Sequence, residues 1–185
     1  MTSTSLDELL SRFTEETKTE RDKGTSFELL VQHYFSYDKL QNGVYDKVWM
    51  FSDWARELGR DATDRGVDLV ARRRDGSGLT AIQAKFYERD RSLRQSDLSK
   101  FIASSTDPIF TSRILVDTTA TELSKNAQYL IKSQEKPFIH IKRKDLEESS
   151  LDWSAILNNL GVRQRSGKQP RDHQREALER ALRGF

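Results

Sequence analysis

The chain has 185 residues, a length that suits one domain with a tail and is too short for two large domains. It contains no cysteine, which excludes disulfides and cysteine-ligated zinc, and no apolar run approaches the roughly 18 residues that cross a bilayer. Its 31 Lys and Arg against 29 Asp and Glu leave a formal charge of only +2, so bulk charge does not indicate a nucleic-acid partner.

The N-terminal segment predicts two helices. Ser5 and Glu8 have the spacing of a capping box ahead of an apolar stripe, which indicates where the first helix begins. A second helix is expected from near Thr25, with one buried face formed by Phe27, Leu30, Val31 and Tyr34. Thr25 and Glu28 again match a capping box, so the structural interpretation of Glu28 is a helix cap.

The middle of the chain predicts three strands. Tyr45 to Phe51 is apolar and aromatic and suits a first strand, and residues 54–64 are expected to be a short helix or an insertion. Val67 to Arg74 and Leu79 to Tyr87 are two β-prone runs. The turn residues between them, Asp75-Gly76-Ser77-Gly78, are a strong short-range signal for a β-hairpin.

The predicted hairpin brings three polar groups together. With residues 76–77 as the loop, Asp68 lies opposite Lys85 and Val70 lies opposite Gln83. Gln83 and Lys85 share a face because the strand period is two. A carboxylate beside a carbonyl oxygen binds a hard divalent cation, and a neighbouring ammonium stabilises a phosphate. This combination points to phosphodiester chemistry; the alternative is an ordinary cross-strand salt bridge between Asp68 and Lys85.

The remainder predicts alternating helices and strands. A helix is expected over 96–106, a strand over Arg113 to Val116, a helix over Thr121 to Lys136 and a strand over Phe138 to Ile141. Strand, helix and strand in that order form a βαβ unit with parallel strands. The fold class is therefore α/β, with a mixed sheet that is antiparallel at the hairpin and parallel beyond it. Further helical turns over 145–160 are expected to close over the core.

Basic residues gather on both sides of the hairpin in sequence. One group runs into the turn and the other follows the second strand, and both are expected to flank the site, where cations contact phosphates. The residues singled out for DNA binding are Arg72, Arg74, Arg89, Arg91 and Arg94. Solvated surface charge is the alternative for each of them. The histidines His33, His140 and His173 lack zinc-binding spacing, so no metal is assigned to them.

The hairpin motif resembles a known family. Asp68 followed by a hairpin and Gln83-Ala84-Lys85 resembles the Mrr-like branch of the PD-(D/E)xK, or restriction-endonuclease-like, nucleases, with Gln83 in place of the usual acid. The element order from Thr25 to Leu146 is similar to the core of that branch. The resemblance implies that Asp68, Gln83 and the Ala84 carbonyl bind Mg²⁺ and that Lys85 stabilises the phosphate or orients a water.

The same resemblance gives Glu28 a second interpretation. Mrr-like nucleases carry a glutamate on the helix before the sheet that approaches the metal, so Glu28 is expected either to help at the site or to cap its helix. The two roles conflict, because a glutamate turned back onto its own helix does not reach the cation.

The C-terminal segment indicates a second unit. Residues 161–170 read as a linker, which divides the chain into a nuclease domain over 1–160 and a tail over 161–185. Residues 169–178 resemble the start of a superfamily 2 helicase, with Gln174 matching the adenine-reading glutamine; an ordinary amphipathic helix end is the alternative. Nuclease followed by helicase entry is similar to the type ISP (single-polypeptide type I-like) restriction-modification enzymes.

These resemblances predict a Mg²⁺-dependent endonuclease domain that acts on double-stranded DNA in the bacterial cytoplasm. Helicase, methyltransferase and target-recognition domains would follow it in the full polypeptide, and the isolated domain would be a monomer. One alternative is a nucleic-acid-binding module that has kept the fold and lost catalysis. Another is a repair or junction-resolving nuclease on the same scaffold, against which the helicase-like tail argues.

Overall fold

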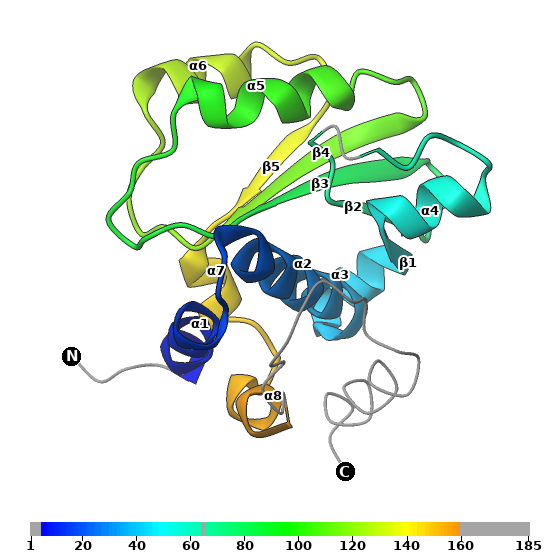
Figure 1. The fold of residues 1–185 in the computed structure, drawn as a ribbon. Helices are drawn as coiled ribbons and strands as arrows, with labels where there is room; N and C mark the ends of the chain where they lie inside the picture. The colour runs from blue at the N-terminus through cyan, green and yellow to red at the C-terminus, as the bar shows by residue number, and fades with distance from the viewer. Residues whose placement is uncertain (1–4, 64–65, 160–185) are drawn as a thin grey trace.

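The computed structural model describes residues 5–63 and 66–159, whose arrangement is shown in Figure 1. The helices are α1 (Ser5–Glu16), α2 (Glu20–Tyr37), α3 (Lys39–Val44), α4 (Phe51–Glu57), α5 (Gln95–Ser104), α6 (Lys125–Lys132), α7 (Arg143–Glu147) and α8 (Trp153–Asn159). The strands are β1 (Tyr45–Met50), β2 (Leu69–Arg73), β3 (Leu79–Lys85), β4 (Phe110–Asp117) and β5 (Phe138–Ile141). Within these ranges no helix is long and apolar enough to cross a membrane.

The strands form one mixed sheet in the order β1-β2-β3-β4-β5. β2 pairs antiparallel with both β1 and β3, and β3, β4 and β5 run parallel. The predicted α/β class, the antiparallel hairpin and the parallel βαβ unit are all confirmed. The central strand β3 is thus the place where the sheet changes from antiparallel to parallel pairing.

Helices cover both faces of the sheet. α1 and α2 lie on one face and α5 and α6 on the other, as Figure 1 shows. On the α2 face, Ile82 of β3 and Ile114 of β4 pack in a core with Phe27. On the α5 face, Ala81 packs with Phe101. Because successive strand residues alternate between faces, Gln83 and Lys85 share the α5 face with Ala81.

α2 begins earlier than predicted, and this changes the interpretation of Glu28. Thr19 is the N-cap, and its hydroxyl accepts a hydrogen bond from the Asp22 N–H at 3.1 Å. Thr25 lies inside the helix, where its hydroxyl donates to the Arg21 carbonyl at 3.1 Å. The predicted capping box of Thr25 and Glu28 is therefore wrong, and Glu28 is a residue of the helix interior.

Other elements differ from the prediction mainly at their ends. α3 was not anticipated, and α4 shows that a helix opens the segment after β1. β4 is longer than predicted and α6 is shorter. α6 begins later than predicted because Ser124 caps it by accepting from the Ala127 N–H at 3.2 Å. β5 has the predicted bounds. Trp153 and Ile156 enter the core as predicted, whereas Leu160 and the predicted linker and helicase-like segment lie outside the described residues.

Asp38 joins two distant segments beneath the sheet. Its side chain is buried, at 2% exposure, and Oδ1 accepts from the N–H groups of Leu40 and Gln41 at 3.0 and 3.1 Å, which caps α3. Oδ2 accepts from the backbone N–H and hydroxyl of Ser150 at 2.9 and 2.8 Å. Burial acts to raise the pKa of Asp38, but the hydrogen bonds from Ser150, Gln41 and Leu40 outweigh it and hold the pKa below its ordinary value.

Replacing Asp38 with alanine is expected to reduce the free energy of unfolding by about 2 kcal/mol, because a helix cap and buried hydrogen bonds are lost together. The melting temperature should fall by roughly 4–8 °C. A folded pKa below the ordinary 3.8 means that this stability is present above pH 3.8 and is lost as pH falls through the folded value. The variant and wild type should therefore converge in melting temperature in acid. Glu148→Ala, which removes an exposed ion pair with Lys144, serves as the control and should melt as wild type does at neutral pH.

Candidate active site

The hairpin has a longer turn than predicted. Arg73 N–H donates to the Gly78 carbonyl at 3.0 Å, so residues 74–77 form the loop. Asp75 closes that loop by accepting from the backbone N–H and hydroxyl of Ser77 at 2.9 and 2.6 Å. The register accordingly pairs Val70 with Ala81, not with Gln83. The predicted register is wrong by two residues, a shift that leaves each side chain on its predicted face.

Asp68 lies at the point where β2 begins. Its main chain is held on both sides, because its N–H donates to the Ile82 carbonyl and its carbonyl accepts from the Phe51 N–H, both at 2.9 Å. Oδ2 of its carboxylate accepts from the Ala84 N–H of β3 at 2.8 Å. Since β2 starts only at Leu69, this carboxylate takes the position beside Ala84 that a longer β2 would occupy.

Gln83 is buried against the segment that leads to Asp68. It is 3% exposed, and its Nε2 donates to the Gly66 carbonyl at 3.2 Å. Gly66 has a φ of 107°, and a Cβ there would lie 3.1 Å from the backbone of Lys100, so glycine permits this close approach. In the described part of the chain Oε1 of Gln83 is buried without a hydrogen-bond partner. Such an acceptor costs about 1–3 kcal/mol in a folded protein, which marks Oε1 as a candidate ligand atom.

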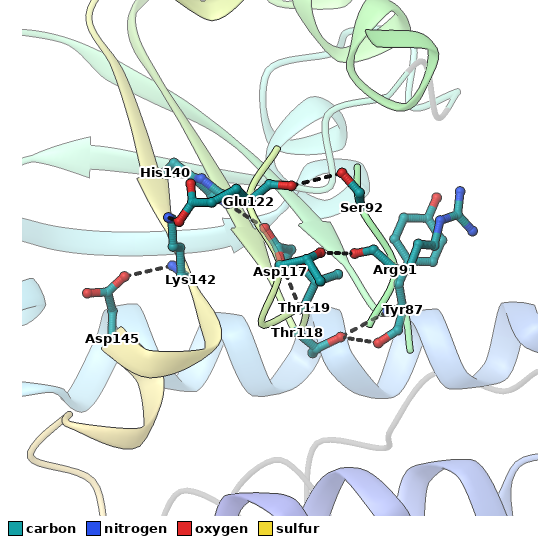
Figure 2. A network of polar contacts seen from close by, with 11 residues as sticks. Tyr87, Arg91, Ser92, Asp117, Thr118, Thr119, Glu122, His140, Lys142 and Asp145 are labelled. Carbon is teal, nitrogen blue, oxygen red and sulfur yellow. Dashed lines mark hydrogen bonds and ion pairs between the residues drawn. The ribbon is translucent and has the colours of Figure 1, made fainter. Parts of the chain in front are cut away.

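Lys85 ends β3 on the same face and is partly exposed. Its ammonium forms no ion pair or hydrogen bond with any residue of 5–63 or 66–159, so the simple cross-strand salt bridge with Asp68 is not formed. Its in-register neighbour on β4 is Asp117, a fully buried carboxylate that the sequence did not single out. Asp117 instead contacts His140 of β5 and Thr119, as Figure 2 shows.

The loops after β3 and β4 are joined by hydrogen bonds beyond Lys85 (Figure 2). The Thr118 hydroxyl donates to the Tyr87 carbonyl at 2.7 Å and accepts from the Tyr87 N–H at 2.9 Å. The Ala120 N–H donates to the Arg89 carbonyl at 2.7 Å. These bonds fix the main chain that carries the second group of predicted DNA-binding arginines.

That second arginine group lies next to the site. Arg89 is 3.7 Å from Asp7 of α1, and Arg91 stacks on the Tyr87 ring at 3.6 Å while pairing with Asp97 at 2.9 Å. Arg94 is exposed at the N-terminus of α5. A cavity of about 490 Å³ lies here and is lined by Arg91, Ser92, Arg94, Ser96 and Asp97.

The first arginine group lies at the other end of the hairpin. Four strand residues at about 3.3 Å each put Arg72 roughly 13 Å from Asp68, and Arg74 lies farther away. Arg72 binds Asp46 through two contacts of 2.9 Å, and Arg74 donates to the Asn42 carbonyl at 2.8 Å. The expectation that both groups flank the site is therefore wrong for Arg72 and Arg74.

The site thus has, at one strand end, one carboxylate, one amide oxygen and one ammonium that is unpaired among the described residues. Within the described residues no group of three or more His, Cys, Asp or Glu side chains is placed to hold a metal ion. Glu28 is carried by α2, which packs on the sheet face opposite to Gln83, so it is placed on the other side of β3 from the amide. The structure brings Asp68, Gln83 and Lys85 to one strand end and adds Asp117, Thr119 and His140 beside Lys85.

Comparisons with known proteins agree with this architecture. The profile of a family described as restriction endonuclease, of the Mrr catalytic type, matches residues 36–160. The chain is similar to the DNA-bound ATP-dependent type ISP restriction-modification enzyme LlaBIII, with 28% identity and a TM-score of 0.64. That match covers 96% of this chain and 11% of the other, so the chain spans about a ninth of LlaBIII.

Two further solved structures resemble the chain more weakly. The MspJI restriction endonuclease, in complex with a 27-mer oligonucleotide, has 19% identity and a TM-score of 0.37 over 72% of this chain and 32% of its own. The protein of unknown function AF1548 has 14% identity and a TM-score of 0.38 over 80% and 96%. No curated protein sequence matches the chain. Because the family profile spans more than half of the sequence, the chain belongs to the Mrr-like restriction endonuclease family.

Proposed function

We propose that this chain is the Mg²⁺-dependent nuclease domain of a restriction-modification enzyme and hydrolyses phosphodiester bonds of double-stranded DNA. The observation that carries the proposal is the group formed at one strand end by the Asp68 carboxylate, Oε1 of Gln83 and the Lys85 ammonium. Neither the amide oxygen nor the ammonium has a partner among residues 5–63 and 66–159. In a member of a restriction endonuclease family, these groups suit cation binding and phosphate stabilisation.

The donor atoms fit a hard divalent cation. Mg²⁺ prefers oxygen ligands, and Asp68 and Gln83 supply a carboxylate and a carbonyl oxygen. In a strand the N–H and C=O of one residue point to the same neighbour, and the Ala84 N–H points to Asp68, so the Ala84 carbonyl is a third candidate. Bound Mg²⁺ would supply charge neutralisation and a more acidic water. A single carboxylate binds it weakly, so we expect the DNA phosphate to complete the site.

The remaining residues are assigned roles around that cation. Lys85 stabilises the charge that develops on the phosphate or orients the attacking water. Glu28, whose capping role is excluded, is assigned to the metal or water from the α2 side. For DNA contact we propose Arg89, Arg91 and Arg94 beside the site, with Arg72 and Arg74 contacting DNA that runs along the hairpin. Arginines of this kind position a duplex without reading its sequence.

Target choice would belong to other parts of a longer polypeptide. We infer this from the similarity to LlaBIII, of which this chain spans 11%, and from the helicase-like residues 169–178. Helicase, methyltransferase and target-recognition domains would then follow the nuclease domain over 1–160, with 161–185 as the connection.

The proposal is tested by cleavage of plasmid DNA with the full-length polypeptide, Mg²⁺ and ATP. Nicks that require Mg²⁺, disappear with EDTA and are absent in the Asp68→Ala variant are the expected result. The competing function is a module that binds DNA without cutting it. Such a module would bind equally with and without Mg²⁺ and leave the plasmid intact at every protein concentration.

Replacing Gln83 with glutamate distinguishes a ligand from a structural amide. If Oε1 binds the metal, the added carboxylate should preserve cleavage and lower the Mg²⁺ concentration at half-maximal rate. Without Mg²⁺ the buried charge beside Asp68 should lower the melting temperature, and Mg²⁺ should restore it. Gln83→Leu keeps the volume and removes both polar atoms, so it should melt normally and cut poorly. A folded Gln83→Glu protein with no cleavage at any Mg²⁺ concentration would contradict the assignment.

A further inference from the structure

Lys85 has an acidic register partner in the sheet, Asp117. The two residues are in-register partners on the parallel strands β3 and β4. Neighbouring strands lie about 4.8 Å apart and in-register residues point to the same face, so a lysine reaches a carboxylate there easily. Asp117 is 0% exposed, and a buried carboxylate requires partners for its charge. The register alone therefore favours an ion pair between Lys85 and Asp117.

The structure gives both oxygens of Asp117 other partners. Oδ1 accepts from the backbone N–H and the hydroxyl of Thr119, each at 2.7 Å. Oδ2 contacts Nε2 of His140, which comes from β5 (Figure 2). Across residues 5–63 and 66–159 no ion pair joins Lys85 to Asp117. The buried carboxylate is thus satisfied by two residues that belong to neither the hairpin nor the proposed metal site.

The position of His140 follows from its strand and from the residues that anchor the end of that strand. Its register partner on β4 is Leu115, two residues before Asp117, so it lies on the same face of the sheet. Two residues after it, Lys142 pairs with Glu122 at 2.7 Å, and the Glu122 carbonyl accepts from the Ser92 hydroxyl at 2.8 Å (Figure 2). The His140 side chain is 14% exposed, which leaves it little freedom to turn away.

We propose that His140 and Thr119 are positioning residues of the nuclease site. They occupy the Asp117 carboxylate and so keep the Lys85 ammonium available for the DNA phosphate. The inference rests on the proposed function, since it assumes that Lys85 acts on the phosphate. Removal of His140 leaves Oδ2 of Asp117 unpaired in the core, and Lys85 is the adjacent cation that can replace it.

The first measurement does not depend on activity. The wild-type chain and His140→Ala are treated with a water-soluble acetylating reagent, and the acetylation rate of Lys85 is followed by peptide mass spectrometry. In His140→Ala the rate should fall about tenfold, because a lysine held in contact with the buried Asp117 carboxylate is shielded from the reagent. Lys132, exposed at the end of α6, serves as the internal control and should react equally in both proteins.

The second measurement is Mg²⁺-dependent plasmid cleavage by the full-length polypeptide. His140→Ala should lose activity about 100-fold, the scale of removing one fixed charge from a transition state. The double variant His140→Ala/Asp117→Asn removes the competing charge and should restore both Lys85 acetylation and cleavage. His140→Gln retains an N–H donor for Asp117 and should remain close to wild type in acetylation. Thermal melting confirms that each variant is folded.

If His140→Ala does not fold, Thr119→Val provides the test instead. Thr119→Val removes the hydroxyl donor to Asp117 and retains the backbone N–H and the side-chain shape. It should lower Lys85 acetylation in the same direction by a smaller factor. Unchanged acetylation in folded Thr119→Val would overturn the proposal in that case.

The outcomes separate this inference from the proposed function. Equal Lys85 acetylation in wild type, His140→Ala and the double variant would overturn the inference alone. So would a folded double variant in which cleavage stays as low as in His140→Ala. If acetylation changes as expected and wild type shows no Mg²⁺-dependent cleavage, the competition for Asp117 stands and the nuclease function fails.

Discussion

Replacing Asp68 with asparagine is expected to lower Mg²⁺-dependent cleavage at least about 100-fold while the fold is kept. Asparagine still offers an oxygen to the Ala84 N–H, so the contact between β2 and β3 survives. The carboxylate is lost, however, and it is the charged member of the proposed donor set. The measurement is single-turnover plasmid nicking by the full-length polypeptide, together with thermal melting.

A matched aspartate separates this loss from a general effect of the substitution. Asp152 caps α8 by accepting from the Ala155 N–H at 3.1 Å, away from the hairpin. Asp152→Asn should cut DNA as wild type does, since asparagine is also a good helix cap. Wild-type nicking by Asp68→Asn would remove Asp68 from the metal site, whatever the behaviour of the control.

Lys85→Ala is expected to abolish cleavage without changing stability. The ammonium makes no contact that holds the described part of the fold together, so the free energy of unfolding should change by less than about 0.5 kcal/mol. Cleavage should fall by about 10²–10³-fold, because a fixed positive charge at the reacting phosphate is lost. The combination of normal melting with lost activity is the signature of a catalytic side chain.

Two companion variants sharpen the Lys85 result. Lys85→Arg retains the charge in a larger, planar group and should recover only part of the activity. Lys132→Ala removes an exposed lysine of α6 and should leave cleavage and melting unchanged. Substantial destabilisation of Lys85→Ala would show that its ammonium has a structural partner and would weaken the catalytic assignment.

The sheet and the convergence of Asp68, Gln83 and Lys85 at one strand end were predictable because their signals are local. Alternating β-prone residues and an Asp-Gly turn identify the hairpin, and Pro137 separates α6 from β5. The register was not predictable from the same signals. Asp75 lengthens the loop to 74–77 through its bonds to Ser77, and a side chain that competes with the backbone in this way is not visible in a pattern of apolar residues.

The other differences between prediction and structure have three separate causes. The polar run before Thr25 contains no apolar stripe, yet Thr19 caps α2 there, and so the helix starts at Glu20. The two arginine groups lie at similar sequence distances from the motif. The turn of the hairpin and its open end lie at opposite ends of the strands, so only the group that follows β3 is close to the site. Asp117 and His140 are 23 residues apart on separate strands, and only the order and register of the sheet bring them together beside Lys85.

The start of β2 at Leu69, one residue after Asp68, affects what mutagenesis can reveal about the site. Within residues 5–63 and 66–159 no strand pairs with β3 beside Ala84 on that side, and the Ala84 N–H donates to the Asp68 carboxylate instead of to a partner strand. In the proposed site the Ala84 carbonyl is then a ligand that the genetic code cannot remove. Codon changes at position 84 alter the side chain on the α2 face and leave the main-chain carbonyl in place, so a mutational screen would record this residue as a packing constraint. Replacing the peptide bond by an ester through chemical synthesis alters the main-chain groups themselves, and it would show what such a screen overlooks.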